Sequence, residues 1–162
     1  MSANQPTNMN NATVNNFKFV MAKIPEIEYF CQSVNIPSIT MGEAIQPNPL
    51  IDRPIPGDKL TFGELSIEFI IDEELRSYEA LHNWMKSITT PESTNQYAGN
   101  SSVFTDAALI VTTNSSNPLL EITFRDIFPT SLGDLNFTTG GNADPLIGDA
   151  SFRFRSYEIR RI

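Results

Sequence analysis

Apolar and polar residues alternate along several stretches of this chain, as they do in strands that bury one face. The clearest stretch runs from Leu60 to Ile71, and its apolar face carries Leu65, Ile67, Phe69 and Ile71. A stretch near the start alternates in the same way at Phe17, Phe19 and Met21. Another apolar stretch, from Tyr29 to Ile36, stops at Pro37. We therefore predict three strands in the first half of the chain.

The pattern changes from a period of two to helical spacing after Asp72. Apolar residues then recur every three or four positions, at Leu75, Tyr78, Leu81, Met85 and Ile88. Asp72 is placed as an N-cap, and Glu73 and Glu74 follow in the first turn, where the helix dipole favours carboxylates. Pro91 ends the segment. We expect one helix whose apolar stripe packs on the sheet.

The second half of the chain returns to strand patterns. The predicted strands are Ala107–Thr113, Leu119–Ile127, Leu132–Thr138 and Ala150–Ile162. Residues Asn114 to Pro118 have the composition of a hairpin connection between the first two. Phe128-Pro129-Thr130 is expected to break the strand that precedes it. The order is strands, one helix, then strands.

The segment from Glu43 to Lys59 combines four prolines with several apolar residues. Proline lacks the N–H that a sheet ladder needs, so a central strand is excluded. We interpret the segment as a stiff, extended excursion that contacts another subunit, because its residues are too apolar for a loop exposed to solvent. The residues assigned to this contact are Ile45, Pro47, Asn48, Pro49, Leu50, Ile51, Pro54, Ile55, Pro56 and Gly57. The alternative is a long loop folded back over its own core.

Composition limits the possible functions. A chain of 162 residues suits one domain, and its low charged fraction with many Phe and Pro favours a β-rich globular fold. The net charge is −8 and basic residues are scattered, which argues against stable nucleic-acid binding. Residues 1–16 form a polar, Asn-rich arm without the features of a secretory signal. No apolar run approaches the roughly 18 to 20 residues that span a membrane.

Residues that could carry chemistry all have simpler explanations. His82, the single histidine, lies within the predicted helix, and no metal-ligand spacing surrounds it. Cys31 has no histidine nearby in sequence, so a structural thiol is the better interpretation. Gly140-Gly141 lacks the lysine or helix of a phosphate loop, and Trp84 at helical spacing from Tyr78 is expected in the core. We predict no enzymatic activity, no cofactor and no metal.

The order of these features resembles the tail tube proteins of contractile-tailed bacteriophages. The resemblance covers about residues 17–162, and the Asn-rich arm has no counterpart in it. The features that carry it are Phe17-Lys18-Phe19, Val34 to Pro37, Asn48-Pro49-Leu50, Gly57 to Phe62, Leu65 to Ile71, Asp72-Glu73-Glu74, Trp84, Phe128 to Leu135, and the aromatics Phe152 and Phe154. The resemblance implies a mainly β fold of two packed antiparallel sheets with one flanking helix.

The resemblance also implies an assembly. Six copies would form a ring in which the inner strands join into a continuous β-barrel, and rings would stack into a hollow tube. The expected partners are further copies of the chain, the tail sheath protein, and the baseplate and tail terminator proteins. The expected location is the virion, after assembly in the bacterial cytoplasm. A closed barrel of this kind would remove the exposed strand edges on which sheets aggregate.

DNA would pass through the lumen without specific binding. An acidic or neutral wall repels phosphates weakly and evenly, whereas a basic wall would retain them. Glu68, Glu121 and Thr123 are predicted as lumen-facing, because each alternates with apolar neighbours in a predicted strand. The alternatives of the same fold are a baseplate tube initiator or a tube-capping protein. From another class, a carbohydrate-binding β-sandwich would need aromatic residues exposed on one face or loop.

Overall fold

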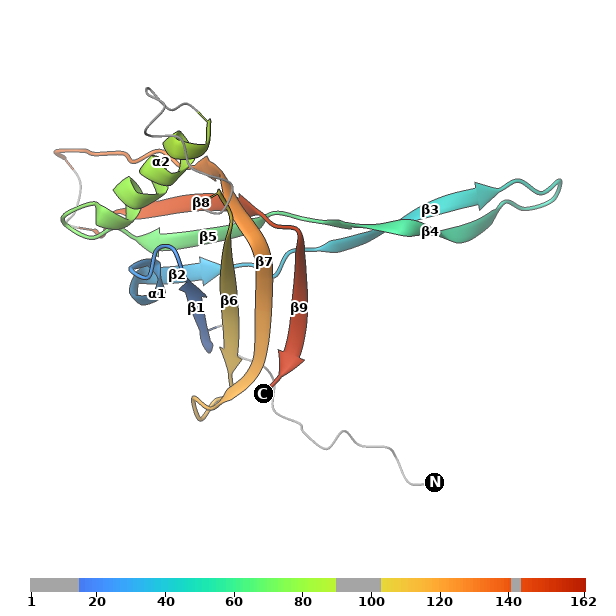
Figure 1. Cartoon of the computed structure of the whole chain (residues 1–162), viewed down its shortest axis with the longest axis horizontal. Helices are drawn as coiled ribbons and strands as arrows, with labels where there is room; N and C mark the ends of the chain where they lie inside the picture. The colour runs from blue at the N-terminus through green and yellow to red at the C-terminus, as the bar shows by residue number, and fades with distance from the viewer. Residues whose placement is uncertain (1–14, 90–102, 141–143) are drawn as a thin grey trace.

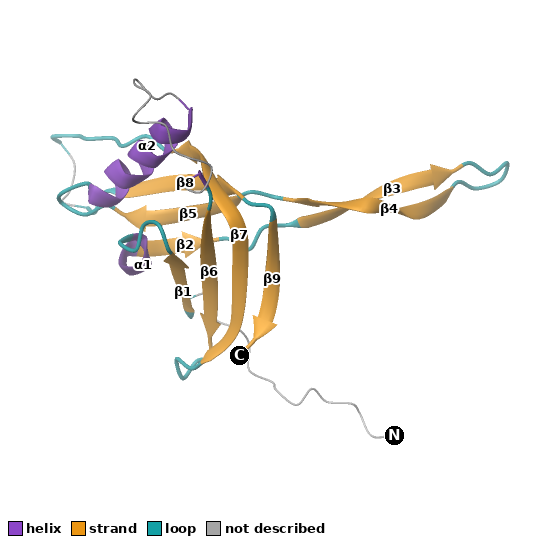
Figure 2. Ribbon diagram, viewed as in Figure 1, coloured by secondary structure: helices purple, strands orange, loops and turns teal. Residues whose placement is uncertain are grey.

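The computed structural model describes residues 15–89, 103–140 and 144–162. They form a mainly β fold with one long helix and one short helix (Figure 2). The helices are α1 (Ile27–Phe30) and α2 (Arg76–Thr89). The strands are β1 (Phe17–Met21), β2 (Cys31–Val34), β3 (Ile39–Gln46), β4 (Arg53–Phe62), β5 (Leu65–Ile70), β6 (Thr105–Thr112), β7 (Pro118–Leu132), β8 (Ile147–Arg153) and β9 (Ser156–Arg161).

Strand β7 connects the two halves of the main antiparallel sheet. Its first part, Leu120–Arg125, lies between β6 and β9, and β1 completes this half on the far side of β6. Its last part, Phe128–Leu132, pairs with β8, which continues through β5 to β2. Between them, Asp126 has a φ of 54° and the β6–β7 register shifts, so β7 changes partners at a bulge. Figure 1 shows the two halves running in different directions.

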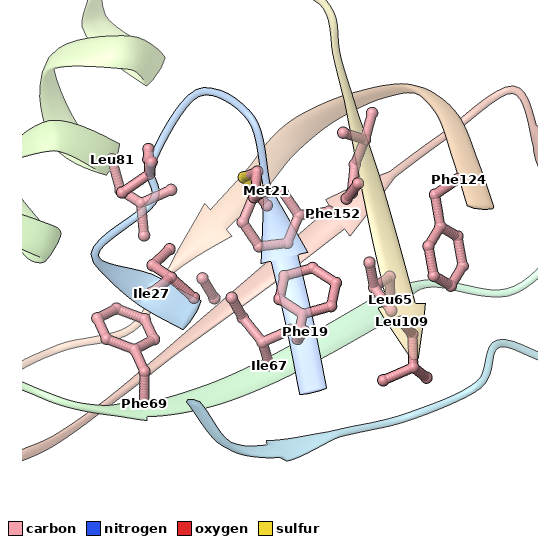
Figure 3. Packing of buried hydrophobic residues seen from close by; sticks show 14 of the residues in the cluster. Phe19, Met21, Ile27, Leu65, Ile67, Phe69, Leu81, Leu109, Phe124 and Phe152 are labelled. Carbon is pink, nitrogen blue, oxygen red and sulfur yellow. The ribbon is translucent and has the colours of Figure 1, made fainter. Parts of the chain in front are cut away.

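The core fills the space between the two halves. Alternate residues of the main-sheet strands, most clearly of β5 and β8, point into it, so the period-two pattern of the sequence corresponds to burial there. Leu81 and Trp84 of α2 close one end of the core, and Figure 3 shows Leu81 beside Ile27. The largest fully buried side chains are Phe19, Phe69, Phe124, Phe152, Met21, Ile24, Ile27, Leu65, Ile67, Leu81, Ile122 and Ile127.

Strands β3 and β4 form a separate two-stranded sheet, the β3–β4 hairpin. It continues from the ends of β2 and β5 and projects away from the main sheet (Figure 1). Both strands are exposed over nearly their whole length. The alternative in which this segment folds back over its own core is therefore wrong. The prediction of an extended excursion outside the central sheet is confirmed, and Pro54 and Pro56 are accommodated because the hairpin has no third strand.

The predicted start of the helix is wrong. Leu75 has a φ of 56°, and its N–H donates to the carbonyl oxygen of Asp72 at 3.0 Å, which closes a turn. Helix α2 consequently begins at Arg76, and Glu73 and Glu74 precede it. Asp72 is not the N-cap, although its Oδ1 accepts a hydrogen bond from the Ser77 hydroxyl at 3.4 Å. The left-handed residue Leu75 lies directly before the helix and delays its start, and the spacing of apolar residues does not reveal this.

Three strand boundaries also differ from the prediction. The stretch Leu60–Ile71 is divided between β4 and β5 around Gly63, whose N–H donates to the carbonyl oxygen of Ser38 at 2.9 Å. The stretch Tyr29–Ile36 begins within α1 and becomes a strand at Cys31. The stretch Ala150–Ile162 contains the end of β8 and all of β9, separated where the chain crosses between the two halves.

Pro129 does not end β7. The strand runs through it to Leu132, so the predicted break at 128–130 and the predicted strand Leu132–Thr138 are both wrong. Pro129 lies beside a register shift, in the part of β7 that pairs on one side with β8. A proline is tolerated at such a position because a bulge or an edge leaves the missing N–H without a required partner.

Candidate assembly surfaces

The tip and outer part of the β3–β4 hairpin expose the apolar residues that the sequence assigned to a contact. Leu50 and Ile51 are 91% and 79% exposed, and Ile45 and Ile55 are 64% and 40% exposed. The remaining predicted contact residues lie in the same hairpin and are exposed, apart from Gly57, which is half-buried. Exposed apolar residues grouped in this way are typical of association surfaces, and the contact with another subunit stays a prediction.

A bulge divides the β3–β4 hairpin into an inner and an outer part. The register shifts between Met41 and Glu43, and Glu43 then faces Pro56. In the inner part, Ile39 and Met41 face Phe62 and Leu60, so their side chains share one face of the ribbon. Ile39, Met41 and Leu60 are exposed as well, although they are not among the predicted contact residues. Their alternation with Thr40 and Thr61 was the available signal.

The root of the hairpin is fixed to the main sheet by aromatic contacts and hydrogen bonds. The Phe62 ring lies 5.6 Å from that of Phe154 and 5.5 Å from that of Tyr157. The Tyr157 hydroxyl donates to the carbonyl oxygen of Pro37 at 3.2 Å. Asn35 accepts from the Ser66 N–H at 2.7 Å and donates to the Glu64 carbonyl oxygen at 3.0 Å. These contacts set the direction in which the hairpin leaves the sheet.

The structure places the predicted lumen residues on different halves of the sheet. Glu68 lies on the outer side of β5, because Ile67 and Phe69 point into the core. Glu121 and Thr123 lie on the outer side of β7, in the part that pairs with β6 and β9. They therefore do not form one surface with Glu68, and their position relative to a lumen stays a prediction.

The outer side of the β2–β5–β8 half is polar and acidic; we call it the acidic face. Ser33, Glu68 and Asp149 are neighbours across β2, β5 and β8. In an adjacent row, Ser66 faces Ser151. Arg153 lies on the same side, but its Nε and Nη2 donate to Glu64 Oε1 at 3.1 and 3.0 Å. Ser33 and Asp149 were not predicted from the sequence, because strand pairing alone brings them beside Glu68.

The outer side of the β1–β6–β9 half has a mixed charge; we call it the mixed face. Its charged residues are Lys18, Glu121, Arg125, Glu158 and Arg160. Arg125 forms an ion pair with Glu158 at 3.3 Å, and Lys18 forms one with Glu28 at 2.6 Å. Half-buried apolar residues, among them Ile110, lie between them. The two outer faces of one subunit therefore differ in charge and in polarity.

The residues considered for catalysis lie in α2, in β2 and in the turn before α2. Trp84 is buried, as predicted, and its Nε1 donates to the carbonyl oxygen of Val103 at 3.2 Å. Burial raises the pKa of the Cys31 thiol to about 11, against a smaller lowering effect of a backbone hydrogen bond with Ser33. His82 is exposed beside an open groove between α2 and Leu132 of β7. The acidic turn Asp72–Glu74 precedes α2.

Two negative findings apply to residues 15–89, 103–140 and 144–162. They contain no group of three or more His, Cys, Asp or Glu side chains placed to hold a metal ion. They also contain no helix with the length and apolar character required to cross a membrane. Gly140 is described at the edge of a gap, whereas Gly141 and the predicted arm up to residue 14 lie outside the described residues.

Comparisons with known proteins agree on the type of protein. The sequence model of a family described as phage tail tube protein matches residues 3–160. The tail tube terminator protein of Enterobacteria phage T4 is 26% identical over 138 residues, covering 80% of this chain and 76% of that protein. The tube-terminating cap of the anti-feeding prophage has a similar fold, with a TM-score of 0.74 and 12% identity over 100% of this chain and 99% of that one. A chain in the structure of the extended sheath–tube complex of an extracellular contractile injection system has a similar fold, with a TM-score of 0.69 and 13% identity over 95% of this chain and 94% of that one.

Proposed function

Because the chain belongs to the phage tail tube protein family, we propose that it is the repeating subunit of a tail tube, which stacks as hexameric rings and conducts DNA. One observation supports ring formation above the others. Among the described residues, β2 pairs only with β5, and Phe128–Leu132 of β7 pairs only with β8. The β2–β5–β8 half therefore has two open edges, which a neighbouring copy on each side would pair.

Pairing these edges around a ring produces a closed barrel. Each copy donates one edge and accepts the other, so the contact is heterologous and closes by rotation. Closure removes the unpaired N–H and C=O groups that make open edges prone to aggregation. In this arrangement one side of the β2–β5–β8 half faces the axis, and the other packs on the core of its own subunit.

The acidic face then lines the lumen. Glu68 and Asp149 present carboxylates in one cross-strand row, and the cation nearest to them in the sheet, Arg153, is paired with Glu64. Duplex DNA carries one negative charge per roughly 1.7 Å of axis, and a wall without unpaired cations offers its phosphates nothing to bind. The mixed face, with Lys18, Arg125 and Arg160, would form the outer surface of the tube and face the sheath.

The β3–β4 hairpin supplies a further contact between copies. The side chains of Leu50 and Ile51 are not buried within their own subunit. Burial of an exposed Leu or Ile against another copy would contribute about 1.5 to 3 kcal/mol to the free energy of association. Proline restricts the hairpin before it docks, so less entropy is lost on association. We assign no enzymatic activity and no cofactor to the chain. Its partners are further copies, the sheath, the baseplate and the tail terminator, in a virion assembled in the host cytoplasm.

A tube-terminating role is the second candidate. It is favoured by the sequence similarity to the phage T4 tail tube terminator and by the fold similarity to the anti-feeding prophage cap. A terminator would form the same ring but would stop rather than extend the stack. The two roles therefore share the subunit fold and the edge contact, and they differ in whether rings of this chain stack on one another.

Electron microscopy of the purified protein tests both roles. The tube role predicts hollow cylinders with a regular ring repeat, and their length should increase with protein concentration. Single rings that bind only to the end of a preformed tube would indicate the terminator role. A protein that remains monomeric at high concentration, with and without sheath protein, would contradict both.

A further inference from the structure

The two edges of β7 are occupied differently. On one edge β8 and β9 follow each other, and the register does not shift between Phe128 and Arg125. Strand β6 pairs with the same residues as β9, so it lies on the opposite edge, and it ends where Thr105 faces Ile127. The rest of this second edge, Phe128–Leu132, is the part of β7 that a neighbouring copy would pair in the ring.

The strand that a neighbouring copy would add there runs in the same direction as β6. Strands β2, β5, β8 and β7 are each antiparallel to the next, and the copies of a ring have one orientation. Strand β2 of one copy is therefore antiparallel to β7 of its neighbour, as β6 is to β7 within a copy. The two strands lie end to end on one edge, and the end of β2 points at the start of β6.

Exposed apolar residues lie at both of these ends. Ile36, just after β2, is 52% exposed, and Phe104, directly before β6, is 47% exposed. The Phe104 ring lies edge-on to the Phe128 ring, with their centroids 5.8 Å apart. The carbonyl oxygen of the preceding Val103 accepts a hydrogen bond from Trp84 Nε1 at 3.2 Å. Phe104 is thus held in position within its own copy, with part of its ring open to a neighbour.

The first of two registers that match core residues across the contact is the level register. Within one copy Val34 and Leu132 lie in one row across β5 and β8. If a neighbouring copy kept the same height, Val34 would face its Leu132 and Ile36 would lie beside its Thr130. The rest of β2 would extend past the end of β7, so most of its hydrogen-bonding groups would stay unpaired.

The second is a shifted register, in which all of β2 lies on the open edge. Val34 then faces Pro129, which is buried on the core side of β7. The register shift between Pro129 and Ser131 allows this displacement without turning Val34 to the acidic face. Closure of a barrel requires a stagger between strands. The shifted register pairs more of both edges, and it brings Ile36 against Phe104, where β6 begins.

We propose that Phe104 is the anchor that sets the register of the ring contact, by packing against Ile36 of the neighbouring copy. The proposal rests on the proposed function, since it concerns the edge that closes the ring. Strand β2 supplies only four residues, so few side chains are available to specify its register. An apolar contact at the end of β2 adds to this specification. Beyond it the chain leaves the sheet at Pro37 and enters the β3–β4 hairpin (Figure 1).

Disulfide trapping in the full chain distinguishes the two registers. In a Cys31→Ala background, Ile36→Cys is combined with Phe104→Cys or, as the matched control, with Thr130→Cys; all three positions are exposed. A disulfide forms only when the two Cα atoms come within about 7 Å. Mild oxidation should therefore link copies into a ladder with the Phe104 pair, and several-fold less with the Thr130 pair. The natural chain and the Cys31→Ala chain are imaged by electron microscopy beforehand.

The outcomes separate the anchor from the proposed function. A dominant ladder for the Phe104 pair supports the anchor. Rings or tubes without that ladder, or with a stronger ladder for the Thr130 pair, would overturn the anchor and leave the tube role intact. If the natural chain and the Cys31→Ala chain both stay monomeric at high concentration, the ring itself is wrong, and the anchor with it.

Removal of the aromatic ring provides an independent test. Phe104→Ala, added to the chain with Ile36→Cys and Thr130→Cys, should increase the ladder several-fold, because the shifted register loses its apolar contact. Phe104→Leu keeps an apolar side chain and should leave the ladder low. Phe137→Ala, which truncates an exposed aromatic ring elsewhere, is the matched control and should also leave it low. An unchanged ladder in the Phe104→Ala chain would show that Phe104 does not set the register.

Discussion

A Cβ atom on Gly57 would lie 2.6 Å from the carbonyl oxygen of Gly42, on the opposite strand of the β3–β4 hairpin. The two glycines meet at the bulge between the inner and outer parts of the hairpin. Because the clashing atoms of Gly42 belong to the backbone, no side-chain rotation could relieve the clash. The direction of the outer part of the hairpin therefore depends on glycine at position 57.

Gly57→Ala should disturb assembly without destabilising the subunit. The added methyl group forces the two strands apart at the bulge, whereas the buried core lies in the main sheet and stays intact. We expect an unchanged melting temperature and fewer or shorter tubes by electron microscopy. Gly140→Ala is the matched control, since nothing lies within 4 Å of its Cβ position. A normal tube yield from Gly57→Ala would show that the bulge is not important for assembly.

Replacing Leu50 and Ile51 with Asp should block association between copies. Both side chains are exposed, so the monomer should keep its circular dichroism spectrum and its melting temperature. Tube or ring formation, measured by light scattering, should be lost. Phe137→Asp, which also changes an exposed apolar residue, is the control. Full-length tubes from the Leu50 and Ile51 variant would contradict the assignment of the hairpin to a contact.

Leu81→Ala should destabilise the subunit itself. Leu81 is fully buried in the core, and truncation of a buried leucine to alanine costs about 2 to 5 kcal/mol. Chemical denaturation of a monomeric variant, such as the Leu50 and Ile51 double substitution, measures this loss without interference from assembly. His82→Ala, one residue along the same helix and exposed, should change the stability little. Equal stability of the two variants would mean that α2 does not close the core.

Glu68→Lys should slow DNA release while leaving tubes intact. The side chain is exposed on the acidic face, so folding should tolerate the change, and a ring of lysines would attract phosphates. The effect should be larger at low salt, where screening is weakest. Glu121→Lys on the other half is the control. If Glu121→Lys slowed release and Glu68→Lys did not, the mixed face would line the lumen instead.

The Cys31 thiol should be unreactive in the folded subunit. Burial raises its pKa from 9.0 to about 11, so the thiolate is scarce at neutral pH. The unfolded chain ionises first as the pH rises through about 9, so this group reduces stability above that pH, and the effect levels off near pH 11. Iodoacetamide should label the native protein far more slowly than the urea-unfolded protein at pH 8. Equal rates would show that the thiol is not protected.

The sequence by itself determined which side of the clearly alternating strands is buried. Phe19, Phe69 and Phe152 were identifiable because a strand alternates its side chains, whatever its neighbours are. It also placed a helix with Leu81 in the core and excluded the proline-rich segment from the central sheet. The family followed from the order of these features. All of this information is local, since it depends on spacing along the chain and on the backbone chemistry of proline.

The tertiary structure decided which strands are neighbours and therefore which outer residues share a face. Alternation assigns Glu68 and Glu121 to the outside equally, but the bend of β7 at Asp126 puts them on different halves. Arg153 and Glu64 are 89 residues apart in sequence, and only strand pairing brings them together. The left-handed turn at Leu75 likewise moves the start of α2 without changing its apolar spacing. A period in the sequence records burial, whereas the partner of a strand depends on contacts between distant segments.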